Sequence, residues 1–158
     1  MGFSTLFVSA QGTSPPHHQL EEWRATDLAA RRRVTTQSVW KLNCGVSVGG
    51  QTILGIKHLD DLARAVGGHR WPFEGWTTPT EPAVWFAEIF PSLVQYPEWA
   101  DEYKKRRDRM QVQSCLRRAA ERDAAGKLKG DFAKPGMLDT VTLTRVEGEE
   151  GWMLWVER

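Results

Sequence analysis

Cysteine is scarce in this sequence, in which Cys44 and Cys115 lie far apart among 158 residues. Two cysteines make neither a disulfide framework nor a four-cysteine zinc site. No stretch approaches the roughly 18 consecutive apolar residues of a membrane-spanning helix. The N-terminus also lacks the basic start, apolar run and cleavage site of a signal peptide. The sequence therefore predicts a cytoplasmic protein with reduced thiols and no membrane partner.

Net charge is almost absent as well. The formal charge is +1, so the chain as a whole does not attract nucleic acid, and any such binding depends on local segregation of charge. The sequence also contains neither an internal repeat nor a low-complexity linker. With 41% hydrophobic and 26% charged residues, it has enough apolar material for a core, which predicts a single domain over residues 1–158.

One apolar run carries an acid inside it. Residues 83–91 lie between Pro82 and Pro91 and contain Glu88 together with the strand-favouring residues Val84, Trp85, Phe86, Ile89 and Phe90. Because the run is apolar on both faces, it predicts a central strand that is covered by helices, with these neighbours mostly buried. A carboxylate there is costly unless it is paired, bound to metal or exposed to a cleft. Glu88 is therefore a site residue, a residue at the frayed end of the strand, or the partner of a nearby arginine.

Helical spacing of apolar residues recurs along the chain. It predicts helices over residues 19–33, from Ser47 as N-cap to Gly67-Gly68, over 98–125 with a break, and a short turn over 140–146. In the helix over 98–125, the residues expected to face inward are Trp99, Tyr103, Met110 and Leu116. Residues 3–9 are expected to form a short strand or an extended lead-in, and residues 38–42 a short strand or a buried turn. Residues 152–156 are expected to form a terminal strand or tail, in which Trp152 and Trp155 close one side of the core.

Positive charge is concentrated in the second half of the chain. Residues 104–129 contain ten Lys or Arg against three acids. The densest part supplies the candidate nucleic-acid contacts, Lys104, Lys105, Arg106, Arg107 and Arg109. Two other segments have two interpretations each. Residues 31–33, three consecutive arginines, form either a solvated helix end or a phosphate contact, and the aromatic segment 69–76 either closes the end of the core or stacks nucleic-acid bases.

Several short segments of the sequence resemble, in their order and spacing, segments of the predicted ribonuclease H-like nucleases of bacteria and archaea. This family is known by a domain-of-unknown-function label. The matching phrases are residues 24–27, 38–40, 45–49, 54–56, 71–76, 87–91, 108–112, 123–126 and 149–154. The resemblance implies an α/β fold of the ribonuclease H-like type, with a mixed sheet flanked by helices.

The same resemblance implies a hydrolase site. Glu88, Asp108 and Asp123 match the family's acids and would be catalytic, with Glu88 and Asp108 as ligands of Mg²⁺ or Mn²⁺. Two-metal hydrolysis of phosphodiesters requires such hard oxygen ligands. A second carboxylate within about 4 to 6 Å of Glu88 would indicate a shared metal. An arginine between the acids would instead indicate an ion pair.

The chain also departs from the family, because nothing in it corresponds to the first strand with its Asp or to the following hairpin. The resemblance therefore implies a partial, N-terminally truncated domain without the leading metal ligand. A shortened sheet exposes an edge, which predicts self-association. Three functions stay open: a metal-dependent nuclease or its inactive remnant, a non-catalytic module that binds nucleic acid or protein, and a structural protein with no ligand.

Overall fold

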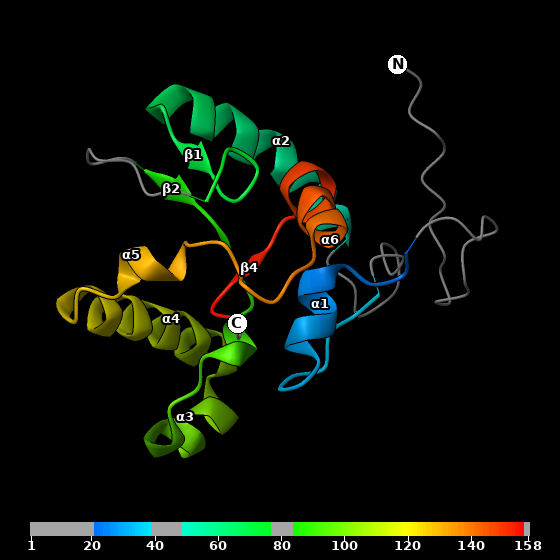
Figure 1. Ribbon diagram of the computed structural model, residues 1–158. Helices are drawn as coiled ribbons and strands as arrows, with labels where there is room; N and C mark the ends of the chain where they lie inside the picture. Colours follow the sequence, from blue (N-terminus) through cyan, green and yellow to red (C-terminus); the bar gives the residue numbers. More distant parts are fainter. Residues whose placement is uncertain (1–20, 39–48, 77–83, 157–158) are drawn as a thin grey trace.

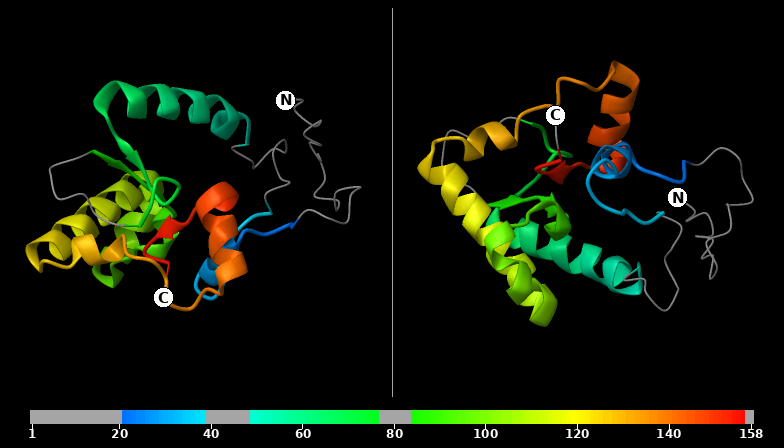
Figure 2. Two further views of the ribbon diagram at one scale, coloured as in Figure 1. Left: turned by 45° about the horizontal axis from the view of Figure 1, so that its top comes forward. Right: turned by 90° about the horizontal axis from the view of Figure 1, so that it is seen from below.

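The computed structural model of the chain describes residues 21–38, 49–76 and 84–156 (Figure 1). It has a mixed α/β architecture. The α-helices are α1 (Ala25–Ala30), α2 (Gly49–Val66), α3 (Ala100–Lys105), α4 (Arg107–Ala124), α5 (Leu128–Asp131) and α6 (Thr140–Arg145). The strands are β1 (His69–Arg70), β2 (Trp85–Phe86), β3 (Glu88–Ile89) and β4 (Met153–Leu154). In Figures 1 and 2, β4 lies between the group formed by α3, α4 and α5 and the pair formed by α1 and α6.

The strands form two small parallel sheets. β1 pairs with β2, with Trp85 opposite His69, and β3 pairs with β4, with Glu88 opposite Met153. Only Ala87 separates β2 from β3, so residues 85–89 connect one sheet to the other. Among the described residues both strand pairs are parallel, whereas the resemblance implied one mixed sheet.

The predicted buried strand over residues 83–90 was wrong in extent and in burial. It consists of two strands of two residues each, Glu88 is exposed, and the four large apolar neighbours are only partly buried: Trp85, Phe86, Ile89 and Phe90. The chain changes its pairing partner at Ala87, so among the described residues each half pairs with one strand only. The strand-favouring composition identified the extended backbone but not its surroundings.

The core is built around the C-terminal strand. It contains Ala30, Trp71, Leu93, Val146, Trp152, Met153, Leu154 and Val156. Trp152 is buried as predicted, whereas Trp155 is partly buried. Trp71 packs edge-on against Trp76 and Phe132, and its indole N–H donates to the Phe132 carbonyl at 2.9 Å. These contacts confirm that the aromatic segment 69–76 closes the core.

Helix α2 ends at Gly67-Gly68 as predicted, with Gly67 at a φ of 60°. The proposed N-cap Ser47, the segment 3–9 and residues 39–42 lie outside the described residues. Ser38, the described residue of the segment 38–42, is buried and is not in a strand. Apolar side chains of α2 are between 46% and 70% exposed: Ile53, Leu54, Ile56, Leu59, Leu62 and Val66. The amphipathic pattern therefore predicted the helix correctly, although most of its apolar side chains remain exposed.

The predicted helix over 98–125 is present with its break. A 3₁₀ turn, η2 (Pro97–Trp99), leads into α3, and Arg106 separates α3 from α4 with φ −144° and ψ 56°. Met110 is buried, and Trp99 and Tyr103 are partly buried, as predicted. Leu116 is 65% exposed, which corrects its inward assignment. Six residues after Met110, Leu116 is turned by about 120° from it around the helix.

The other predicted helices differ mainly at their ends. Within the segment predicted over 19–33, α1 spans Ala25–Ala30. The turn predicted over 140–146 is α6, which continues into a π-helical segment, η3 (Val146–Glu150). Asp139 caps α6 by accepting a hydrogen bond from the Thr142 N–H at 2.9 Å. A further 3₁₀ turn, η1 (Pro91–Leu93), follows β3.

Candidate functional site

Glu88 lies against Arg24, the residue that precedes α1. The Arg24 Nη1 and Nη2 atoms donate to the two carboxylate oxygens of Glu88 at 2.7 and 2.8 Å. The Nε atom of Arg24 donates to Asp27 Oδ2 at 2.9 Å. Asp27 is buried, with an exposed fraction of 4%, whereas the side chain of Glu88 is 44% exposed. Arg24 therefore lies between the two acids, and both oxygens of Glu88 are occupied by its guanidinium.

Glu150 extends this charged cluster to the other end of the chain. One of its carboxylate oxygens accepts a hydrogen bond from the Ala25 N–H at 2.8 Å, and the other forms an ion pair with Arg145 Nε at 2.7 Å. The Glu150 carbonyl also accepts a hydrogen bond from Arg24 Nη1 at 3.2 Å. The cluster of Arg24, Asp27, Glu88, Arg145 and Glu150 thus connects α1, β3, α6 and η3.

The electrostatics of the cluster keep Arg24 charged. Burial alone would lower the pKa of the Arg24 guanidinium, but the hydrogen bonds to Glu88 and Asp27 raise the pKa above its ordinary value. A permanently charged arginine that holds two carboxylates is an ion-pair centre. The sequence-based alternative for Glu88, pairing with a nearby arginine, is confirmed.

Asp108 and Asp123 lie at opposite ends of α4. Fifteen residues separate them, which corresponds to about 22 Å along a helix axis. Both side chains are exposed. Over the described ranges, no three residues of the types His, Cys, Asp and Glu gather closely enough to hold a metal ion. The carboxylates do not fit the compact donor set that Mg²⁺ or Mn²⁺ requires, and we derive no metal-dependent step from them. The metal roles of Glu88 and Asp108 stay predictions.

The densest basic residues occupy the junction of α3 and α4. Lys104 and Lys105 form exposed ion pairs one turn back along α3, with Asp101 at 3.1 Å and with Glu102 at 3.8 Å. Arg106 lies at the break itself. The first turn of α4 carries the exposed Arg107 and Arg109. In the part of the chain that the structure describes, these last three arginines have no carboxylate partner.

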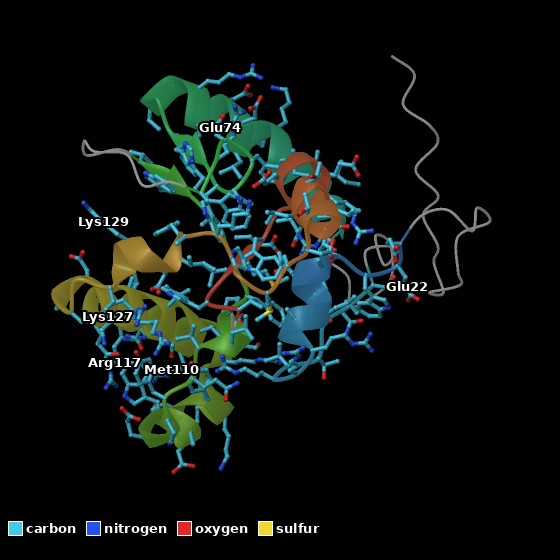
Figure 3. All side chains as sticks on the ribbon, in the orientation of Figure 1. Glu22, Glu74, Met110, Arg117, Lys127 and Lys129 are labelled. Atoms are coloured by element: carbon cyan, nitrogen blue, oxygen red, sulfur yellow. The ribbon has the colours of Figure 1, made fainter. Side chains whose placement is uncertain are left out.

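Farther along α4, two arginines are tied to acids. Arg117 binds Glu98 and Glu121, each at 2.7 Å, and its guanidinium lies 3.9 Å from the centre of the Tyr96 ring. Arg122 forms an ion pair with Asp131. Figure 3 shows Arg117 beside α4, and Lys127 and Lys129 near its far end. Among the described residues, Arg118, Lys127 and Lys129 also lack a carboxylate partner, so the free cations extend along the whole helix.

The sequence did not reveal the central role of Arg24. The three-residue spacing to Asp27 indicates a contact one turn apart on a helix. Its bond to Glu88 joins residues 64 positions apart, and its bond to Glu150 joins residues 126 positions apart. No local pattern specifies such contacts, because they depend on how α1, β3 and η3 pack together.

Comparisons of the chain with protein-family models, with curated proteins and with solved structures found no match. None of the helices in the described ranges is long and apolar enough to cross a membrane. The function is therefore inferred from the arrangement of charged and aromatic residues in the structure.

Proposed function

We propose that this protein binds nucleic acid through the basic segment, defined as residues 104–129, and that its acidic residues contribute little or no phosphodiester cleavage. The observation that carries the proposal is the pairing state of the ten cations in this segment. Within the described residues, six of them have no carboxylate partner: Arg106, Arg107, Arg109, Arg118, Lys127 and Lys129.

Unpaired cations matter because phosphate binding releases counterions and requires no precise geometry. The paired lysines add to the available charge. Lys104 and Lys105 form exposed ion pairs, and such pairs contribute only about 0 to 1 kcal/mol, so a phosphate can replace either carboxylate at small cost. The segment thus offers a positive surface even though the whole chain carries a net charge of only +1.

The ribonuclease H-like fold belongs to the same proposal. What supports it is the order of the matching phrases, the acid on β3 beside a parallel strand, and the long helix that follows with Asp108 and Asp123. Under this proposal the chain retains the nucleic-acid-binding surface of a nuclease domain. The Glu88 carboxylate, which the resemblance implies to be a metal ligand, is instead bound by Arg24.

A salt titration tests the binding. Fluorescence anisotropy of a labelled single strand should give a linear plot of log affinity against log salt, with a slope of about −4 if six phosphates are contacted. Replacing Arg107 and Arg109 by Gln should reduce the slope by about one to two units. The matched control replaces Lys57 and Arg64 by Gln, which removes the same charge from the paired, exposed face of α2.

The control variant should bind as the unaltered chain does. A flat salt response, or an equal loss in both double variants, would show that the basic segment does not contact phosphates. A cleavage assay of the same strand in Mg²⁺ or Mn²⁺ tests the second half of the proposal. If the unaltered chain cleaves the strand and Glu88→Gln does not, the proposal of little or no cleavage is wrong and the protein is a nuclease.

A further inference from the structure

Two large aliphatic side chains are exposed in the middle of the basic segment. Val112 and Leu116 of α4, here called the apolar pair, are 61% and 65% exposed. They lie four residues apart and are therefore neighbours on one side of the helix. The buried residues Met110 and Ser114 mark the side of α4 that packs on the protein. At about 100° per residue, Val112 is turned by about 160° from both of them. The apolar pair thus points away from the core, and α4 lies at the edge of the molecule in Figures 1 and 2.

Exposed arginines lie on both sides of the apolar pair. Arg109 is turned from Val112 by about 60° in one direction around the helix, and Arg118 by about 120° in the other. Both arginines belong to the unpaired cations that carry the proposed function. The stretch 109–120 contains neither Asp nor Glu. This part of α4 therefore combines an exposed apolar centre with positive charge on either side.

The major groove of B-form DNA presents the complementary arrangement. The phosphate backbones of the two strands form its edges, and the methyl groups of thymine are apolar groups on its floor. The groove is about 12 Å wide and admits an α-helix, whose diameter with side chains is about 10 to 12 Å. Other nucleic acids match less well. The major groove of an RNA duplex is too deep and narrow for side chains to read, and a single strand offers one backbone instead of two.

We propose that α4 lies in the major groove of duplex DNA, with the apolar pair against thymine methyl groups and with Arg109 and Arg118 at the phosphates of opposite strands. This inference rests on the proposed function and names its substrate class. The phosphate contacts fix the position of the helix on the duplex, and the methyl contacts favour sequences rich in A·T pairs. Burial of one methyl group corresponds to about a fourfold gain in affinity, so the preference is modest.

The first test removes only the thymine methyl group. Two duplexes of alternating A and T are compared by fluorescence anisotropy, one of which carries deoxyuridine in place of every thymidine. The deoxyuridine duplex should bind about fourfold more weakly for each methyl group contacted. Replacing both members of the apolar pair by Ala should make the two duplexes bind almost equally. The matched control is Leu54→Ala, a similarly exposed leucine on α2, which should discriminate as the unaltered chain does.

A second arm tests the contacts with the two backbones. Arg109→Gln and Arg118→Gln should each reduce the slope of log affinity against log salt by about 0.9 on duplex DNA, and the double variant by about twice that. At equal salt, the unaltered chain should bind the DNA duplex more tightly than an RNA duplex of corresponding sequence or a thymidine single strand of the same length. Circular dichroism checks that each variant is folded, which the exposure of all four side chains favours.

Equal binding of the thymidine and deoxyuridine duplexes overturns the placement of α4 in the groove, as does a preference that persists without the apolar pair. An RNA duplex or a single strand that binds as tightly as the DNA duplex has the same consequence. Sedimentation provides a further check: self-association of the free protein that Leu116→Ala abolishes would assign the apolar pair to a contact between two copies and overturn the placement. In each of these cases, salt-dependent binding that persists leaves the proposed function intact. Absence of salt-dependent binding to all three nucleic acids overturns both.

Discussion

Arg24 donates to both carboxylate oxygens of Glu88, at 2.7 and 2.8 Å, across 64 positions of sequence. The same guanidinium binds the buried Asp27. This one side chain therefore decides whether the acid on β3 is available for chemistry. It also joins the start of α1 to the only charged residue of β3.

Removing Arg24 should destabilise the fold far more than removing its exposed partner. Arg24→Ala leaves Asp27 buried without its cation, and breaking a buried pair in this way costs about 3 to 5 kcal/mol of unfolding free energy. Glu88→Gln should cost about 1 kcal/mol or less, because the Glu88 side chain is 44% exposed. Urea denaturation of both variants measures the difference. Equal losses would mean that Asp27 is stabilised by other groups.

Gly68 should not tolerate a side chain, because a Cβ atom there would overlap the ring of Phe86. Overpacking of this kind costs about 1 to 3 kcal/mol. The matched control is Gly55→Ala in the exposed middle of α2, where a Cβ atom meets nothing within 4 Å. That substitution should stabilise the protein by about 0.5 to 1 kcal/mol, because alanine favours the helix. Thermal unfolding of the two variants should therefore shift in opposite directions.

Local structure was largely predictable, because helix signals are carried by neighbouring residues. The pattern of apolar residues and Gly67-Gly68 predicted the end of α2, and the proline and acids at 97–102 predicted the start of the helical region that contains α3 and α4. The surroundings were less predictable. Leu116 has the composition of a core residue, but its exposure depends on which face of α4 packs against η1, which the local sequence does not specify.

The candidate site illustrates the same limit. The acid on β3 and the basic segment were visible as local features of the sequence. The partner of that acid was not, because Arg24 and Glu88 meet only after α1 and β3 have packed together. A small pocket beside α4 is likewise lined by Arg33, Arg118 and Trp155, which come from distant parts of the chain. Sequence patterns predicted which residues carry charge but not which charges remain unpaired.

The cap of α6 should make stability depend on pH in the acid range. Hydrogen bonds from the Thr142 N–H and hydroxyl hold the pKa of Asp139 below its ordinary value. A depressed folded-state pKa adds stability above the unfolded-state pKa, near pH 4, and this stability is lost as the pH falls through the folded-state pKa. The advantage of the native chain over Asp139→Asn should therefore be present at neutral pH and disappear in strong acid.

Chemical denaturation at several pH values measures this difference. Asp139→Ala is the reference variant, because it lacks an acceptor for Thr142 at every pH and should stay less stable than Asp139→Asn throughout. A difference between the native chain and Asp139→Asn that does not change with pH would show that the carboxylate charge plays no part in the cap.

Divalent metal should leave the stability of the protein almost unchanged. Both oxygens of Glu88 are held by Arg24, and Asp108 and Asp123 lie at opposite ends of α4. A metal present at 100 times its dissociation constant would add about 2.7 kcal/mol to the folded state. In a chain of this size, that corresponds to a rise of several degrees in the melting temperature. Millimolar Mn²⁺ or Mg²⁺ should instead raise it by less than about 1 °C. A larger rise that is abolished by Glu88→Gln, but not by Asp61→Asn on the exposed face of α2, would mean that Glu88 exchanges Arg24 for a metal ion and that the hydrolase site implied by the resemblance is present.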